Sequence, residues 1–400
     1  MTERSRYLCG ICLLCLTIGS EQEAAAQTQT GLTPRSVLVG LTNAAGESSG
    51  VSNLGGVIAD LVGLEVSTAP IGSSAGGFTF TFDPVTRAFE RAAPSFGPMF
   101  GERAITAGEG RASFGINYIH ATYDKFDGVN IGDGSLKTVA LNQGATPVLT
   151  GTIQLTVTTD TVIAFANVAL NGWWDVAVAV PFVNLHIDGT HQIGNEIAEG
   201  SGSANGVGDI ALRSKIRVYP QGQGGVALGV DLRLPTGDPQ AMLGAGVSRT
   251  LVSGIWSSTA GPFAPHASAG FEFWGNAFQA YDPFQQARVD AGRHGFVYDG
   301  GVEWASSPVL TVNAEIMGRT ITDGGRLDYR NLPLSQNPFG ITSASIATVD
   351  PRGLHRISFA AGIKWNLAGT ALLTANILLP LNDQGLRDNL TPVIGLDWGF

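Results

Sequence analysis

The chain has 400 residues, of which 14% are charged and 54 are glycine, and its formal net charge is -10. An average soluble domain has about 25% charged residues, so many side chains here are expected to face an apolar medium. The acidic balance argues against a nucleic-acid partner, which would need a basic face. After the N-terminal stretch no apolar run approaches 18 residues, which excludes membrane-spanning helices.

The N-terminus has the order of parts of an export signal. Arg4 and Arg6 precede the apolar stretch 7–18, and the alanines at 24–26 offer a cleavage site. The stretch is too short to span a bilayer, which takes about 20 residues. We therefore expect residues 1–26 to be a signal peptide. All three cysteines lie within it, so the mature chain is expected to have no thiol chemistry: Cys9, Cys12 and Cys15.

Residues 27–110 are expected to form an N-terminal segment that plugs the barrel described below or extends from it into the periplasm. Apolar residues recur at helical spacing within 54–66, which predicts a short helix. Phe78–Phe82 alternates strictly and can pair with Thr86–Arg91 as a hairpin. We assign this hairpin to the N-terminal segment because its turn is short for an external loop. The candidate plug residues are Leu54, Ile58, Leu61 and Val62.

From residue 111 to residue 400, segments of roughly 10 to 17 residues alternate apolar with small or polar side chains, as in transmembrane barrels. In one of them Val226 and Leu228 oppose Asp231 and Arg233. Residues two apart share one face of a strand, so one face is apolar and the other polar. The predicted fold class is all-β: an antiparallel transmembrane β-barrel of about twelve strands, or about fourteen if the N-terminal hairpin joins it.

Connection lengths distinguish a barrel from a soluble β-sandwich. Outer-membrane barrels alternate short periplasmic turns with long external loops, and a sandwich has no reason to keep that order. The short connections are Asn171-Gly172, 220–225, 260–262, 306–308 and Ala368-Gly369. The long ones are 127–151, 188–206, 236–248, 275–294, 322–353 and the shorter 382–389.

The last strand supports the same prediction. An alternating apolar strand that ends in phenylalanine resembles the signal by which the barrel-assembly machinery recognises outer-membrane proteins. Its residues are Ile394, Leu396, Trp398 and Phe400. We therefore expect this machinery and outer-membrane lipid as partners, and the C-terminus in the periplasm. Other aromatic residues near strand ends predict interfacial girdles: Phe271, Phe273, Trp304 and Trp365.

Three stretches carry a family resemblance: DVAVAVPF at 175–182, GVGDIALRSKIR at 206–217 and LRLPTGD at 232–238. They resemble the outer-membrane transporters filed under the meta-pathway of phenol degradation, over roughly residues 110–400. That group is similar to the long-chain fatty-acid transporter class, in which an N-terminal plug occupies the barrel. The resemblance implies a transporter fold and assigns no functional residue.

The polar faces of the predicted strands supply a set of candidate pore-lining residues. Mixed rings of charge can tune the selectivity of a pore. Alternatively, the same charges can neutralise one another and fill a small lumen with ion pairs, and barrel width does not decide between the two. The candidates are Asp209, Arg213, Lys215, Arg217, Asp231, Arg233, Glu272, Asp299, Glu303, Asn313, Glu315, Arg319, Arg356 and Lys364.

Motifs for catalysis or metal binding have simpler explanations. Gly46–Gly50 fits G-x-S-x-G, but a nucleophile elbow needs an α/β sheet, which this chain lacks. Aspartates around 124–133 could bind calcium, but turns use the same residues and no complete EF-hand loop is present. The six histidines are scattered. We therefore expect no enzyme, no metal and no cofactor.

The leading hypothesis is an outer-membrane channel for passive uptake of small, hydrophobic or aromatic molecules, with such a molecule as ligand. An alternative is a structural or surface-interaction barrel that binds a partner through its long loops. A third is a barrel enzyme acting on lipids, which would need a Ser/His pair on the outer face.

Overall fold

The structure is a computed structural model. It describes residues 33–43, 54–68, 70–73, 77, 79–83, 88–91, 93–141, 147–193, 196–275, 278–282, 287–291, 294–322, 326–333, 343–350 and 352–400. The predicted signal peptide and the Gly46–Gly50 motif lie outside these residues.

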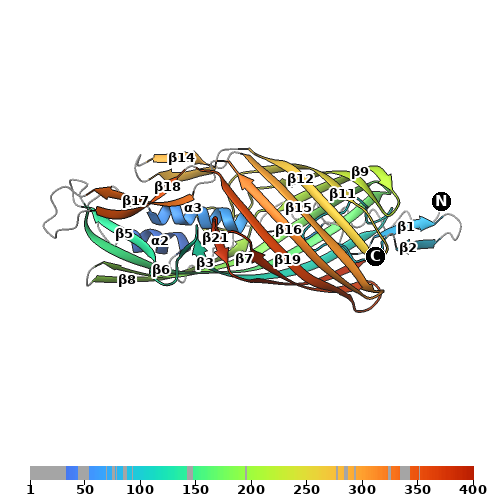
Figure 1. Ribbon diagram of the computed structural model, residues 1–400, viewed down its shortest axis with the longest axis horizontal. Helices are drawn as coiled ribbons and strands as arrows, with labels where there is room; N and C mark the ends of the chain where they lie inside the picture. Colours follow the sequence, from blue (N-terminus) through green and yellow to red (C-terminus); the bar gives the residue numbers. More distant parts are fainter. Residues whose placement is uncertain are drawn as a thin grey trace, which may run out of the picture. The chain divides into compact units, whose positions relative to one another are not determined.

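Twelve antiparallel strands form a closed barrel (Figure 1). Each strand pairs with the next one in the barrel, and β3 closes it by pairing with both β6 and β22. The predicted count of twelve is confirmed. The strands are β3 (Ala112–Phe126), β6 (Pro147–Asn171), β7 (Trp174–Ile193), β9 (Ala211–Gln221), β10 (Gly224–Arg233), β11 (Arg249–Ser257), β12 (Phe263–Trp274), β15 (His294–Ser307), β16 (Leu310–Ile321), β19 (Leu354–Asn366), β20 (Ala371–Pro380) and β22 (Thr391–Gly399).

Hairpins and short strands lie outside the barrel path. β1 (Phe80–Asp83) and β2 (Ala88–Arg91) pair only with each other, so the N-terminal hairpin does not join the barrel, as predicted. The others are β4 (Val129–Asn130), β5 (Leu136–Leu141), β8 (Glu196–Val207), β13 (Phe278–Asp282), β14 (Ala287–Ala291), β17 (Arg326–Pro333), β18 (Ser343–Asp350) and β21 (Leu386–Asp388).

The two ends of the barrel differ. One end, called here the turn end, has the short connections and the C-terminus, and the other, the loop end, has the helices and the hairpins of β14, β17 and β18 (Figure 1). Long stretches predicted as loops are strands instead: β5 and β8 pair with β6 and β7 and extend the wall. The expectation of loops over 127–151 and 188–206 was wrong. The alternation of side chains typical of β-strands continues through both stretches, but there the apolar face points inward and the polar face points outward.

This reversal is clear along β7. Near the turn end, the outward Phe182 is apolar and exposed, and Asp175 points inward and is buried. Toward the loop end, the outward Asn184 is polar, whereas Leu185 and Ile187 point inward and are fully buried. A lipid-facing strand must be apolar outside, but a strand that rises above the lipid can be polar outside. The reversal therefore marks the upper edge of the apolar band.

Two helices fill the loop end: α2 (Pro34–Asn43) and α3 (Leu54–Ser67). The helix predicted within 54–66 is thus confirmed. Ile58, Leu61 and Val62 are buried in one apolar cluster with α2 and the inverted wall of β6 and β7. None of the helices among the described residues is long and apolar enough to cross a membrane.

Candidate channel interior

Most of the predicted pore-lining residues do face the barrel interior, and half of the fourteen bind the N-terminal segment there. Residues 93–107, called here the lumen segment, pass through the turn-end half of the barrel. The carboxylate of Glu315 accepts hydrogen bonds from three successive amides of this segment, at 2.6 Å from Met99, 3.1 Å from Phe100 and 2.8 Å from Gly101. A single strand carboxylate therefore holds a whole turn of the lumen segment.

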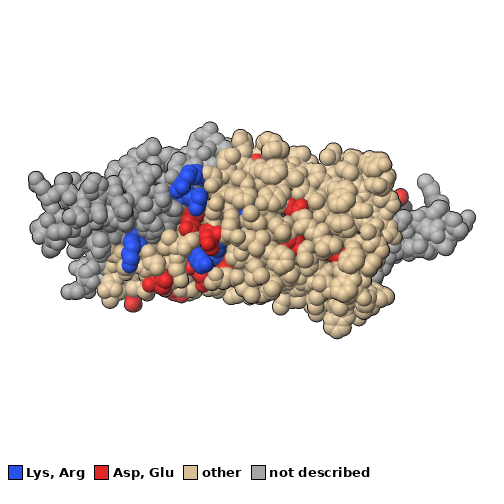
Figure 2. Space-filling view, in the orientation of Figure 1, with Lys and Arg blue, Asp and Glu red and all other residues tan. Residues whose placement is uncertain are grey.

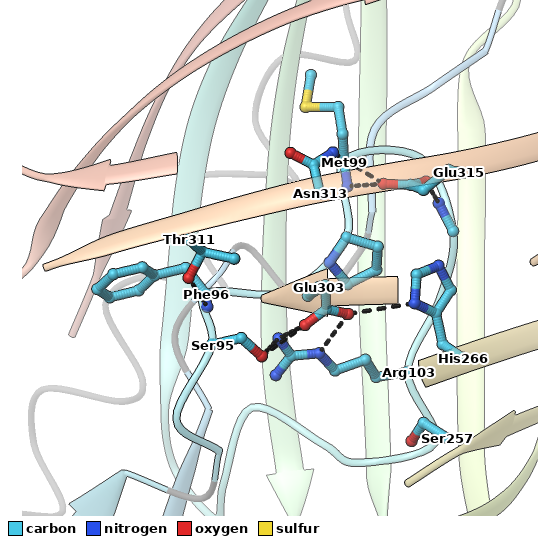
Figure 3. A network of polar contacts seen from close by, with 12 residues as sticks. Ser95, Phe96, Met99, Arg103, Ser257, His266, Glu303, Thr311, Asn313 and Glu315 are labelled. Atoms are coloured by element: carbon cyan, nitrogen blue, oxygen red, sulfur yellow. Dashed lines mark hydrogen bonds and ion pairs between the residues drawn. The ribbon is translucent and has the colours of Figure 1, made fainter. Parts of the chain in front are cut away.

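A second carboxylate binds a side chain of the same segment (Figure 3). Glu303 forms an ion pair with Arg103 and also accepts a hydrogen bond from Ser95 at 2.6 Å. His266 lies on the other side of this carboxylate, with its Nδ1 3.2 Å from Oε1 of Glu303. Each of these side chains is buried, and a carboxylate in such a place needs partners of this kind.

Other wall residues bind the backbone of the lumen segment. The Thr311 hydroxyl accepts from the amide of Phe96 at 3.0 Å, and Lys364 donates to the carbonyl of Pro98 at 2.7 Å. The Ser257 hydroxyl likewise accepts from Ala104 at 3.0 Å. The segment has no regular secondary structure, so the wall supplies the hydrogen bonds that its buried backbone requires.

Ion pairs gather nearer the loop end, where α3 ends. Arg356 pairs with Glu65 of α3, and Arg319 pairs with Glu272 at 2.6 Å. Arg233 and Arg249 both donate to the carbonyl of Ser67, the last residue of α3, at 2.8 and 2.7 Å. Cations are favoured at a helix C-terminus, where carbonyls lack partners inside the helix.

A cavity of about 250 Å³ lies between the end of α3 and the lumen segment. One part of its wall is charged and includes Arg213 and Asp231, which form an ion pair with each other. Another part of the wall consists of apolar side chains and of side chains with hydroxyl groups. Its residues include Ile71, Phe100, Ile119, Tyr123, Thr159, Thr161, Met317 and Leu378. At the loop-end rim, burial raises the pKa of the Asp388 carboxyl.

The remaining candidates occupy different places. Asp209 accepts from the amides of Gly237 and Ala245, both at 3.2 Å, and so holds the 234–248 connection inward. Asp299 accepts a hydrogen bond from Ser268 beside the cavity. Arg217 lies apart from the rest, near the end of β9, where it donates to the carbonyls of Gly222 and Gly224 in and beside the following turn.

Some interior residues gave no signal in the sequence. Arg103 and Glu102 lie in an irregular segment without periodicity, so nothing marked them as interior. Arg249 begins β11, whose inward face mixes Arg249 with Leu251 and Ile255, and this mixture hid it. Only the closed barrel around the lumen segment brings these residues to the same interior.

The aspartates weighed as calcium ligands have other roles. Asp127 pairs with Arg326 at 3.3 Å, and Asp124 accepts from the side-chain amide of Asn389 at 2.7 Å. Among the described residues, no group of three or more His, Cys, Asp or Glu is arranged to hold a metal ion.

The outer face of the barrel is apolar between two aromatic levels. Trp304 and Trp365 are exposed near the turn end, and Phe271 and Phe273 are exposed nearer the loop end. Figure 2 shows few charged side chains over the barrel strands, and most of them gather toward the loop end. Such a band with aromatic borders is typical of an outer-membrane barrel.

Above this band the exterior becomes polar. Tyr118 and His120 of β3 both contact Asp160 of β6, at 2.6 and 2.8 Å. On β7, His186 contacts Asp188 at 2.9 Å. The contacts to Asp160 tie β3 to β6, whereas the contact between His186 and Asp188 lies within β7.

Comparison with known proteins finds a family that part of the chain resembles. Residues 137–292 match the family described as "Putative MetA-pathway of phenol degradation". This match confirms the resemblance expected from the sequence over the part that it covers. A search of curated proteins finds no match.

Solved structures with a similar arrangement are outer-membrane barrels. They include an outer membrane channel from Pseudomonas putida F1, with 11% identity, a TM-score of 0.49 and coverage of 73% of this chain and 96% of that one. A Pseudomonas aeruginosa FadL homologue has 12% identity, a TM-score of 0.34 and coverage of 83% and 97%. The Ralstonia pickettii toluene transporter TbuX has 9% identity, a TM-score of 0.34 and coverage of 73% and 90%. With its closed barrel and apolar belt, the present chain is an outer-membrane protein.

Proposed function

We propose that the protein is an outer-membrane channel for passive uptake of small, hydrophobic or aromatic molecules. The central cavity carries this proposal. Its volume is about 250 Å³, and a protein cavity of about 150 Å³ is enough to bind benzene. Phe100, Met317 and Leu378 supply an apolar surface for a ring, and the ion pairs on the other part of the wall can bind a polar substituent.

The proposal assigns the role of plug to residues 27–110. In support, the end of α3 lines the loop end of the cavity through Glu65 and Val66, and the lumen segment lines its other end through Phe100 and Glu102. A solute that crosses the barrel must therefore pass both parts. The family match over 137–292, whose description names phenol degradation, is in line with an aromatic solute.

Uptake into cells tests the proposal, because lipopolysaccharide slows the entry of hydrophobic solutes that cross ordinary bilayers unaided. Cells with and without the full chain are given labelled toluene or phenol at low concentration, and the initial uptake rate is measured. We expect the expressing cells to take up at least one of the two solutes faster. Equal rates for both, with folded protein present in the outer membrane, would refute channel function.

A further inference from the structure

One side of the turn-end lumen has buried polar groups for which the described part of the chain supplies no hydrogen-bond partner. They lie on the inward faces of β3, β6, β20 and β22. Six residues make up this surface, called here the unpaired strip: Ser113, Asn117, Asn167, Thr374, Asn376 and Asp397. Each has at least one buried nitrogen or oxygen without a hydrogen-bond partner, and in Asn167 both side-chain polar atoms lack one.

Unpaired buried polar atoms are rare in proteins, because removing them from water without a new hydrogen bond is unfavourable. When several lie on one surface, water or a polar solute is the usual partner. The register places these residues together. Ser113 is opposite Asn167, and Gly395 lies between Asn117 and Thr374. A Cβ at Gly395 would lie 2.1 Å from Asn117 and 2.5 Å from Thr374, so the glycine leaves room for both side chains.

The strip continues directly from the central cavity. On β3 the cavity ends at Ile119, and the next inward residue is Asn117. On β20 it ends at Leu378, and the next inward residue is Asn376. From there both strands run to the turn end. The strip is therefore a polar surface that leads from the cavity to Ser113 near that end of the barrel on β3, whereas on β20 it ends at Thr374, because the next inward residue, Leu372, packs against Phe96.

Two halves of the same lumen differ in how they hold the N-terminal segment. On one half, Thr311, Ser257 and Glu315 bind the lumen segment directly. On the strip side, the chain around Gly72 lies against Asn117, since a Cβ at Gly72 would be 2.6 Å from its amide nitrogen. The residues around Gly72 form their hydrogen bonds with other parts of the lumen and not with the strip.

These bonds tie residues 70–73 to other parts of the lumen. Ser73 donates to the carbonyl of Met99 at 2.8 Å, and the carbonyl of Gly72 accepts from Arg213 at 2.7 Å. Moving residues 70–73 away from the strip would therefore leave the bonds of the lumen segment to the wall in place. It would also withdraw Ile71 from the apolar cluster that it forms with Ile119 at the cavity floor.

We propose that solutes leave the central cavity along the unpaired strip, beside a lumen segment that stays bound to the opposite wall. Among the small solutes of the proposed function, the strip favours neutral ones that carry a hydroxyl or amide group, because its polar atoms are mainly those of amides and hydroxyls. This inference rests on the proposed channel function and names the solute class and the route.

Thr374 and Thr311 provide a matched test. Both are fully buried. They lie on the two strands that flank β19, each directly opposite Lys364, so they are at the same height of the barrel. Thr311 binds the lumen segment, whereas the Thr374 hydroxyl has no partner. Thr374→Cys and Thr311→Cys are made in the full chain with Cys9, Cys12 and Cys15 changed to Ala. Labelling by a water-soluble methanethiosulfonate is then followed in the reconstituted protein.

We expect Thr374→Cys to react at least about tenfold faster, because thiol labelling requires access of water and reagent. Asn167→Cys against Ser257→Cys repeats the comparison if either threonine variant fails to fold, as judged by the heat-dependent gel shift of barrels. Equal labelling rates within the folded pair would overturn the hydrated route. This readout needs no solute flux, so it remains decisive even if the channel function itself fails.

Flux tests the second half of the proposal. Erythritol is used as a neutral polyol in liposome swelling, before and after labelling. We expect labelled Thr374→Cys to lose most of its swelling rate, and Thr311→Cys treated with the same reagent to keep it. Fast labelling of Thr374→Cys with unchanged swelling would mean that water reaches the strip but solutes take another route, and would overturn the assignment.

Discussion

Arg103 and Glu303 are 200 positions apart in the sequence and form a buried ion pair inside the barrel. Nε of Arg103 lies 3.2 Å from the carboxylate of Glu303. Nη2 of Arg103 also donates a hydrogen bond to the Ser95 hydroxyl at 2.8 Å. One partner belongs to the lumen segment and the other to β15. The pair is therefore a direct link between the N-terminal segment and the wall that surrounds it.

Glu303→Ala should weaken this link. It leaves the guanidinium of Arg103 buried without its carboxylate, and breaking a buried pair in this way costs about 3–5 kcal/mol. We expect a lower urea midpoint for unfolding in lipid vesicles and a higher ion conductance in planar bilayers, because the lumen segment is released. The two measurements distinguish loosening of the segment from loss of the whole barrel.

The control is the double variant Arg103→Ala with Glu303→Ala. If the two residues act as a pair, the double variant is less destabilised than the sum of the single ones, because no charge is left alone. Strictly additive effects on stability would contradict the link.

Glu315→Ala should act on the backbone of the lumen segment. It removes the acceptor of three buried amides, and each buried donor left unsatisfied costs about 1–3 kcal/mol. We expect faster hydrogen exchange at Met99, Phe100 and Gly101, with the barrel strands still protected.

Glu315→Gln is the matched control for that change. It keeps an oxygen that can accept from the same amides and removes the charge. Exchange at 99–101 should stay closer to that of the unaltered protein. If Gln and Ala accelerate exchange equally, the three amides do not depend on this acceptor.

The sequence predicted the barrel well because lipid imposes a rule that can be read locally. Leu212, Ile216 and Leu228 must face lipid, and they recur with period two and are exposed in the structure. The rule fails above the lipid. Leu185 and Ile187 keep the same period with the opposite polarity, since their partners are the helices of the N-terminal segment. That contact is non-local, so the stretch that follows, 188–206, was read as a loop.

The interior was predictable in kind but not in arrangement. Inward charges such as Arg319 and Glu272 followed from alternation, whereas their pairing depends on which strands become neighbours. The sequence left open whether the charges line a pore or neutralise one another. The structure pairs many of them and directs others at the N-terminal segment. That segment has no periodicity over 93–107, so its bonds to Glu303 and Glu315 could not be foreseen.

Met317→Trp should reduce uptake if the central cavity holds the solute. Met317 lines the cavity, and a larger side chain there occupies volume that a ring would need. We expect a severalfold lower initial rate of toluene or phenol uptake at an unchanged amount of folded protein. Ile316→Trp is the control, because Ile316 is adjacent on β16 and faces outward into the apolar band. Equal uptake by the two variants would argue that solutes do not enter this cavity.

Leu228→Arg tests the height of the membrane. Leu228 is exposed on the outer face of β10, between the levels of Trp256 and Phe271, so it is expected near the middle of the apolar band. An arginine on the lipid face costs about 2–4 kcal/mol at the midplane and about 0–1 near the interfaces. Asn184→Arg places the same charge on the polar exterior of β7, above the reversal. We expect a clear loss of folding free energy in vesicles for Leu228→Arg and almost none for Asn184→Arg. Similar losses for the two would mean that the reversal of polarity along β7 does not mark the edge of the lipid.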